Sequence, residues 1–434
     1  MTIRIRPYKE PEGSDIVGTV TELFAGVGGF RLALSRSGLK TVFSNQWEPS
    51  TKSQHASDCY VFNFGDEGHT NLNITHLVDQ HLANMGRLIP KTDVIVGGYP
   101  CQDYSVAKSL NSSRGLEGKK GVLWWDIHRL VESNKPTYVF LENVDRLLKS
   151  PASQRGRDFA VMLKTLGSLG YKVEWRVINS AEYGFPQRRI RVFIVATKTR
   201  RTTSLKSAEA EEIIYRGGVL ARALPIRKKR SLMSEIDLHD PPEVISGTFG
   251  SGGGKSPFAN AGVFQGGKAF TVKTEVSTPR HAVILGDVLV DDDDVPLEYW
   301  VPESRLPEWR YLKGAKTIDR THKASGERYK YAEGGMAFPD LLSNPSRTIL
   351  TGEGGTSPSR FKHIIKMPRG YRRLVPVELE RLSGFPDDWT KFSFGTKELG
   401  DARRAFFIGN ALVVGLVEKV GKVLAEDLRV IKRR

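Results

Sequence analysis

Cysteine is scarce in this 434-residue sequence, which holds only Cys59 and Cys101. Two cysteines do not make a disulfide framework, and no Cys or His pair has the spacing of a zinc site. Long apolar runs are missing too, because none approaches the roughly 20 residues of a membrane-spanning helix. Residues 1–15 are polar and charged, without the apolar stretch of a secretion signal. We therefore expect a cytoplasmic protein with no membrane segment and no metal.

Acidic side chains are outnumbered, since 49 Asp and Glu stand against 65 Lys and Arg and leave a net charge of +16. Such an excess favours a polyanionic partner, because neutralising phosphates releases their counterions. Charge alone does not distinguish DNA from RNA or from a membrane surface. Hydrophobic residues make up 39% of the chain, as in globular proteins, and its length allows two domains of ordinary size.

Short apolar runs and helical patterns alternate between residues 17 and 198. This alternation predicts an α/β fold, doubly wound and Rossmann-like, with a mostly parallel sheet and helices on both faces. The predicted strands are 19–24, 41–44, 93–96, 138–141, 171–178 and 191–196, and the predicted helices are 30–37, 122–132 and 159–169.

The pattern changes after residue 199. Residues 200–402 are rich in Gly, Pro and Ser, and they predict a second, smaller and irregular domain with strand-like runs at 282–285, 287–290 and 347–350. Helical patterns return at 377–382 and 403–429. We expect an N-terminal extension (1–16), a first domain (17–199) completed by a docked C-terminal helix (403–434), and a second domain with its return segment (200–402).

A glycine-rich loop, FAGVGGF, follows the first predicted strand at residues 24–30. Gly26, Gly28 and Gly29 would let a ligand approach the backbone, and the free N–H groups of such a loop favour an anion. The third glycine comes too early for a dinucleotide site, which favours a ligand such as S-adenosylmethionine. At the end of the second strand, Trp47 could stack on adenine and Glu48 could bind ribose, although a surface pair explains them equally well.

Cys101 follows Pro100, directly after the strand 93–96 and two glycines. A lone cysteine is most often an inert buried residue. Ligands bind beyond the carboxyl ends of strands in α/β sheets, however, so this cysteine is a candidate nucleophile.

Three charged residues are predicted at the same edge of the sheet. Glu142 ends the strand 138–141, where a carboxylate is either a helix cap or a catalyst. Arg189 and Arg191 stand at the start of an apolar strand, where they would face phosphate, a polar base edge or solvent.

The order and spacing of these segments resemble the C5-cytosine-specific DNA methyltransferases of bacterial modification systems. The resemblance covers the first domain and the C-terminal part, and it leaves out the second domain, which in this family recognises the target sequence. The matching segments are 24–29, 100–102, 142–144, 187–191, 372–386 and 409–411.

The resemblance implies transfer of a methyl group from S-adenosylmethionine to C5 of a cytosine flipped out of double-stranded DNA. Cys101 would add to C6, Glu142 would hydrogen-bond N3 and N4, and Arg189 and Arg191 would lie near the base. Residues 108–120 would form a loop that closes over the DNA. The implied cofactor-binding residues are Phe24, Gly26, Gly28, Gly29, Trp47, Glu48, Asn73, Ile74, Pro100, Leu123, Asn410 and Ala411.

Three positions depart from the family pattern. Gln46 and Asn73 stand where the family commonly has acids that contact the cofactor, and Ala411 replaces a frequent serine. The resemblance also implies a monomer that works in restriction–modification, with a cognate endonuclease, or in phage defence. The alternatives are an RNA cytosine methyltransferase, as in the branch of the family that acts on transfer RNA, and a non-catalytic DNA-binding protein on the same fold.

Overall fold

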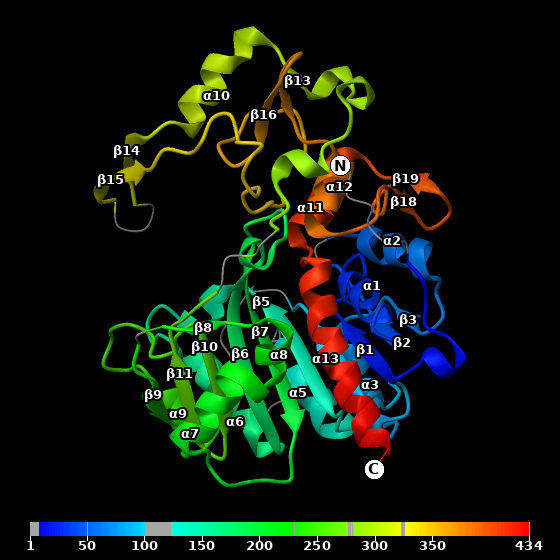
Figure 1. The fold of residues 1–434 in the computed structure, drawn as a ribbon, viewed down its shortest axis with the longest axis vertical. Coiled ribbons are helices and arrows are strands. Elements are labelled where there is room, and N and C mark those ends of the chain that lie inside the picture. The colour runs from blue at the N-terminus through cyan, green and yellow to red at the C-terminus, as the bar shows by residue number, and fades with distance from the viewer. Residues whose placement is uncertain are drawn as a thin grey trace.

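The computed structural model describes residues 8–49, 51–99, 123–229, 231–276, 279, 281–322 and 326–433. Pro100, Cys101 and the loop predicted at 108–120 therefore lie outside the described residues. Within them the chain forms a large unit around one broad sheet and a smaller unit above it, made mostly of residues after about 282 (Figure 1).

The broad sheet has ten strands in the order β3-β2-β1-β4-β5-β7-β6-β10-β11-β9. Neighbouring strands from β3 to β5 run parallel, and every pairing beyond β5 is antiparallel. The strands are β1 Gly18–Leu23, β2 Leu39–Asn45, β3 His69–Thr70, β4 Val94–Gly97, β5 Tyr138–Asn143, β6 Tyr171–Asn179, β7 Ile190–Lys198, β9 Ser234–Asp237, β10 Ala261–Gln265 and β11 Lys268–Val272.

The predicted α/β class is confirmed, but the sheet is parallel only in one half. Residues 180–189 alone join β6 to β7, and a parallel crossover needs a dozen or more residues. β10 and β11 are joined by Gly266 and Gly267, both with positive φ, in a tight hairpin. Short connections therefore account for the antiparallel β6–β7 and β10–β11 pairs.

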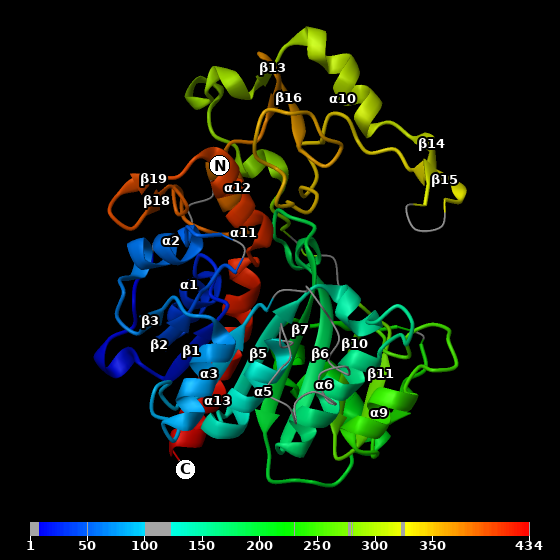
Figure 2. The same cartoon turned by 180° about the vertical axis from the view of Figure 1, so that it is seen from behind.

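Helices cover both faces of the sheet (Figures 1 and 2). Alternate residues of one strand enter opposite layers: Val94 and Val96 pack with α1 and α13, and Ile95 packs with α3, α5 and α6. On one face lie α1 Gly29–Ser35, α8 Val219–Ala223 and α13 Val414–Arg433, and on the other α3 Ile74–Ala83, α5 Leu123–Asn134 and α6 Arg157–Ser168.

The chain enters the smaller unit later than the sequence predicts. The expected boundary at residue 199 is not a boundary of the sheet, because β9, β10 and β11 extend it from the far side of β6. The remaining elements of the larger unit are α2 His55–Phe64, α7 Ser207–Glu212, β8 Arg227–Lys228, α9 Pro242–Thr248, β12 Thr274–Glu275, β18 Phe392–Ser393, β19 Lys397–Glu398 and α12 Asp401–Asn410.

The smaller unit contains a three-stranded sheet in the order β13-β17-β16 and a separate pair, β14 and β15. The strand-like runs at 282–285, 287–290 and 347–350 are not strands. Residues 285–288 form a 3₁₀ turn. Residues 347–350 lie along the larger unit without belonging to a strand, and Ile349 N donates to Gln187 Oε1 at 3.1 Å. The elements are β13 Trp300–Val301, α10 Leu306–Lys313, β14 Lys316–Thr321, β15 Arg328–Glu333, β16 Ile364–Met367, β17 Gly370–Arg373 and α11 Pro376–Ser383.

The predicted C-terminal helix is interrupted. Residues 411–413 separate α12 from α13, so the helical pattern at 403–429 spans two helices. α13 packs along α1 in the larger apolar layer, so the C-terminal segment lies against the first part of the chain.

Candidate active site

The predicted site segments meet at one edge of the sheet. Leu23 at the end of β1 pairs with Asn45 of β2 and Gly97 of β4, and Gly97 pairs with Leu141 of β5. β7 runs the other way, so it starts where β5 ends, with Val192 opposite Asn143. We call this row of strand ends the catalytic edge.

The glycine loop after β1 has the backbone that its sequence requires. Phe24, Gly26 and Gly28 have φ of +55°, +56° and +86°. A Cβ on Gly28 would lie 2.0 Å from the Phe64 ring, whereas a Cβ on Gly26 would meet no heavy atom of the described residues within 4 Å. The Phe64 ring therefore excludes a side chain at Gly28, whereas a small ligand can approach the backbone at Gly26.

Gln46, one of the departures from the family pattern, holds this loop. Its Oε1 accepts a hydrogen bond from Gly26 N at 2.8 Å. Trp47 beside it is 37% exposed, so its indole is available for stacking.

Two other predicted cofactor residues cap helices. Glu48 Oε2 accepts from Ala56 N at 3.2 Å near the start of α2, and Asn73 Oδ1 accepts from Thr75 N at 2.9 Å at the start of α3. Ile74 is buried, Leu123 is half-buried at the start of α5, Asn410 is exposed at the end of α12, and Ala411 follows it half-buried. Gln46, Glu48 and Asn73 thus each use a side-chain oxygen in a contact within the protein.

Glu142 and Arg191 form an ion pair at the centre of the edge. Arg191 Nε lies 2.8 Å from Glu142 Oε1, and the two side chains are 19% and 12% exposed. The other carboxylate oxygen, Oε2, lies 3.2 Å from where a Cβ of Gly98 would be. Glu142 is therefore oriented by an arginine and faces the turn that leads to Pro100 and Cys101.

Asn143 fixes that turn to β5. Its Nδ2 donates to Tyr99 O at 3.1 Å, and its Oδ1 accepts from Val144 N at 2.8 Å. The resemblance names this asparagine only as part of a motif, and its contact with the backbone at Tyr99 is visible only in three dimensions.

Arg189 occupies a different environment from Arg191. Its side chain is buried, with Nη1 donating to Ile349 O at 3.2 Å and Nη2 to Gly409 O at 3.0 Å. Burial, followed by the neighbouring charge of Arg191, lowers the pKa of Arg189 to about 9. Arg189 thus joins the start of β7 to a segment of the smaller unit and to the end of α12.

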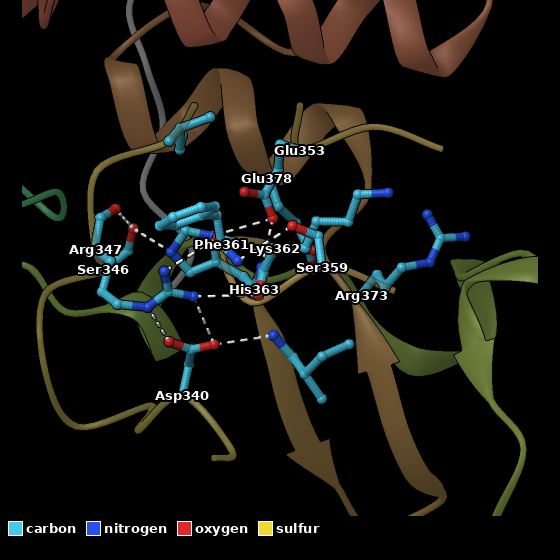
Figure 3. A network of polar contacts seen from close by, with 12 residues as sticks. Asp340, Ser346, Arg347, Glu353, Ser359, Phe361, Lys362, His363, Arg373 and Glu378 are labelled. Carbon is cyan, nitrogen blue, oxygen red and sulfur yellow. Dashed lines mark hydrogen bonds and ion pairs between the residues drawn. The ribbon is translucent and has the colours of Figure 1, made fainter. Parts of the chain in front are cut away.

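The segment that Arg189 contacts leads into a network of buried charges in the smaller unit (Figure 3). Arg347 donates to both oxygens of Asp340, and His363 Nδ1 lies 3.0 Å from Glu353 Oε1. Lys362 Nζ donates to Gly355 O at 2.9 Å and to Ser357 O at 2.7 Å. These buried side chains hold the exposed loop after Ile349 from beneath.

A second buried polar cluster lies under the glycine loop, and sequence reasoning missed it. Glu22 accepts from Tyr60 Oη at 3.0 Å and from Arg31 N at 3.3 Å, and burial raises the pKa of Glu22 to about 7. His69 stacks on the Tyr60 ring, with 4.6 Å between centroids, and burial with the nearby charge of Arg31 lowers the pKa of His69 to about 4.

The described residues carry neither a membrane span nor a metal cluster. None of their helices is long and apolar enough to cross a bilayer. No three or more of their His, Cys, Asp and Glu side chains are grouped so that they could hold a metal ion.

Known proteins resemble this chain in sequence along nearly its whole length. A family model described as C-5 cytosine-specific DNA methylase matches residues 18–426. The type II methyltransferase M.Sau3AI of Staphylococcus aureus is 44% identical over 411 residues, which cover 93% of this chain and 94% of that protein. The type II methyltransferase M.HhaI of Haemophilus parahaemolyticus is 34% identical over 174 residues, 40% of this chain and 47% of that protein.

A solved structure shares the fold. The Dnmt2 methyltransferase of S. pombe superposes with a TM-score of 0.55 over 95% of this chain and 99% of that one, at 15% identity. This likeness bears on the fold alone.

Proposed function

The chain belongs to the C-5 cytosine-specific DNA methylase family, and we propose that it methylates a cytosine within one specific sequence of double-stranded DNA, with S-adenosylmethionine as the methyl donor. It is a cytosine-C5 DNA methyltransferase of the type II restriction–modification kind. The observation that carries the proposal is the Glu142–Arg191 pair, which faces the turn before Cys101 on the catalytic edge.

The glycine loop and its neighbours are suited to the methyl donor. Among the described residues nothing fills the space above Gly26, whose N–H is held by Gln46, and the neighbouring residue Trp47 is 37% exposed. Both segments follow strands that end at the edge that carries Glu142. Phe24, Gly28 and Gly29 would shape this pocket, with Leu123, Asn410 and Ala411 around it. When bound, S-adenosylmethionine supplies an electrophilic methyl group on a sulfonium.

Cys101 is the proposed nucleophile. Its thiolate would form a bond to C6 of the flipped cytosine, and the displaced electron pair of the C5–C6 double bond would be delocalised toward N3. C5 then has the nucleophilic character of an enamine and takes the methyl group. Loss of the C5 proton and expulsion of the thiolate would restore the double bond and the free cysteine.

Glu142 is the proposed partner of the ring nitrogens. A proton shared between its carboxyl group and N3 would neutralise the negative charge that builds up when sulfur attacks. Arg191 would orient the carboxylate through its Nε contact of 2.8 Å. Arg189 has both Nη groups bound to backbone carbonyls, which supports a positioning role for it beside this pair.

We also propose that the protein acts as a monomer in the bacterial cytoplasm beside a cognate restriction endonuclease. The support is its relation to M.Sau3AI, whose name identifies it as a type II methyltransferase.

Expression in a bacterial host that lacks DNA methylation tests the proposal. Bisulfite sequencing of the host DNA should show methylated cytosines at one short sequence, and Cys101→Ala should abolish the signal while DNA binding survives. A variant at a remote exposed acid, Glu426→Gln on α13, serves as the matched control. An unmethylated host genome with well-expressed, folded protein would refute the proposed function.

A further inference from the structure

The β14–β15 ribbon stands apart from the rest of the smaller unit. Lys316–Thr321 and Arg328–Glu333 pair with each other in antiparallel register and with no other strand among the described residues. In both views the ribbon lies at one end of the smaller unit, above the β10–β11 end of the large unit (Figures 1 and 2). The proposed catalytic steps involve none of its residues.

One face of the ribbon is braced against its own unit. Lys316 and Arg360 both pair with Glu333, and Arg360 Nη2 donates to Gly334 O at 2.7 Å. On the same face the guanidinium of Arg320 lies over the Tyr331 ring, 3.8 Å from its centroid. An isolated two-stranded ribbon is marginally stable in water, so this bracing fixes how its other face is presented.

The opposite face is fully exposed and made of small or hydrogen-bonding side chains. The register places Asp319 opposite Lys330 and Thr321 opposite Arg328 on it. Within the described part of the chain, Asp319, Arg328 and Lys330 have no ion pair or side-chain hydrogen bond. Its members are Thr317, Asp319, Thr321, Arg328, Lys330 and Ala332.

These groups match the chemistry of DNA base edges. A guanidinium donates to N7 and O6 of guanine, a carboxylate accepts from N4 of cytosine, and threonine or alanine methyls contact the thymine methyl. A two-stranded ribbon fits the major groove, which is about 12 Å wide. The face lacks the large apolar anchor on which a protein partner would depend.

The position of the smaller unit supports the same partner. Ser346 and Ile349 of this unit contact the segment that begins β7, because Arg188 N donates to Ser346 O at 2.8 Å and Ile349 N to Gln187 Oε1. A duplex that presents a base to Glu142 is therefore next to this unit. The chain's net charge of +16 favours the same polyanion.

We propose that the exposed face of the β14–β15 ribbon enters the major groove of the DNA substrate and that Arg328 reads a base edge there. This inference rests on the proposed function. It adds the element and the side chains that would select the sequence.

Binding of purified full-length protein to two duplexes of equal length tests it, one carrying the sequence found by bisulfite mapping and one unrelated. Arg328→Ala should weaken binding to the first duplex about 10- to 100-fold and leave binding to the second within about twofold. Arg429→Ala is the matched control, because it removes an exposed arginine from α13, the helix whose C-terminal end lies at the opposite end of the molecule from the ribbon (Figure 1). Thermal unfolding of both variants should match the parent protein.

Bisulfite sequencing with Asp319→Ala adds a second readout, and it should show methylation at sites that differ from the parent target at one position. Equal weakening on both duplexes, with a shallower salt dependence, would mean a phosphate contact and would overturn base reading. An Arg328→Ala protein that behaves like Arg429→Ala would overturn the ribbon as a DNA contact. Either failure leaves methylation by the parent protein intact, which distinguishes it from failure of the proposed function.

Discussion

The two units of this molecule hold their functional residues in different ways. In the large unit, Glu142 and Arg191 stand at the ends of apolar strands, with Phe140, Leu141 and Phe193 buried behind them. In the smaller unit, the side chains around β16 that brace the exposed loop are themselves buried charges (Figure 3). In the first arrangement one ion pair stands at the end of an apolar core, whereas in the second each buried charge depends on the next for its partner.

The two arrangements predict different losses of stability when one charged side chain is replaced. Replacing the Glu142 carboxylate by an amide of the same shape removes an ionisable group and keeps a hydrogen-bond acceptor for Arg191. Removing one member of a buried charge network leaves its partner uncompensated in a low dielectric, at a cost of about 3–5 kcal/mol. We therefore expect substitutions at the catalytic edge to lower activity more than stability, and substitutions in the buried charge network to lower stability.

The largest effect is expected at the catalytic edge. Glu142→Gln keeps the shape and loses the shared proton, so kcat should fall by roughly 10²- to 10⁴-fold. Thermal unfolding should stay near the parent temperature, because the glutamine has the same shape and its Oε1 can still accept a hydrogen bond from Arg191 Nε. Methyl-transfer kinetics measure kcat and calorimetry measures the unfolding temperature, with Glu426→Gln as the control. Activity within tenfold of the parent would remove Glu142 from the chemistry.

The next effect is expected in the smaller unit. Asp340 accepts from Arg347 and Ile364 N and lies 3.3 Å from the buried Nζ of Lys313. Asp340→Ala should destabilise this unit by about 3–5 kcal/mol, which amide hydrogen exchange would report in β16 and α10 and leave absent in β5.

A second substitution sharpens that result. Lys313→Met in the Asp340→Ala background removes the uncompensated cation and should restore part of the protection. Loss of protection in both units together would show that they unfold as one cooperative body.

The smallest expected effect is the pH dependence of stability that arises from Glu22, a buried carboxyl group of the large unit. Because burial raises its pKa from 4.5 to about 7, the folded state binds more protons than the unfolded state between these values. The free energy of unfolding should therefore fall as the pH rises from about 4.5 to 7, by at most about 3 kcal/mol, and then level off. Glu22→Gln should abolish this fall in denaturant titrations at a series of pH values.

His69 acts in the opposite direction in the same cluster. Its pKa is lowered to about 4, so the stability that depends on its neutral form is lost as the pH falls below 6.5. Both proteins carry His69, so the difference between them isolates Glu22. Parallel curves for the two proteins across this range would contradict the shift.

The sequence predicted those parts of the fold in which local pattern decides structure. The short apolar runs before Gly97 and at 138–141 mark β4 and β5, and a glycine-rich sequence marks the loop after β1. The motifs also placed Glu142 and Arg191 at one edge, where they pair.

Partners distant in the chain could not be predicted. Arg189 binds carbonyls at 349 and 409, and Lys313 lies between Asp340 and Lys362 O, so no local pattern contains these contacts. The segment 347–350 resembles a strand in sequence, yet the backbone N–H and C=O of Ile349 bond to the side chains of Gln187 and Arg189. Irregular segments of this kind depend on their surroundings and not on periodicity.

Covalent trapping tests the central claim most directly. A duplex with 5-fluorocytosine at the target position cannot lose fluorine as it loses a proton, so thiolate addition and methyl transfer should leave a stable protein–DNA adduct. We predict an adduct that depends on S-adenosylmethionine, maps to the peptide containing Cys101 and is absent from Cys101→Ala. Cys59 should stay unmodified, because it is buried and desolvation raises the pKa of its thiol to about 12. No adduct from a protein that methylates the unsubstituted duplex, or an adduct on another residue, would contradict the account.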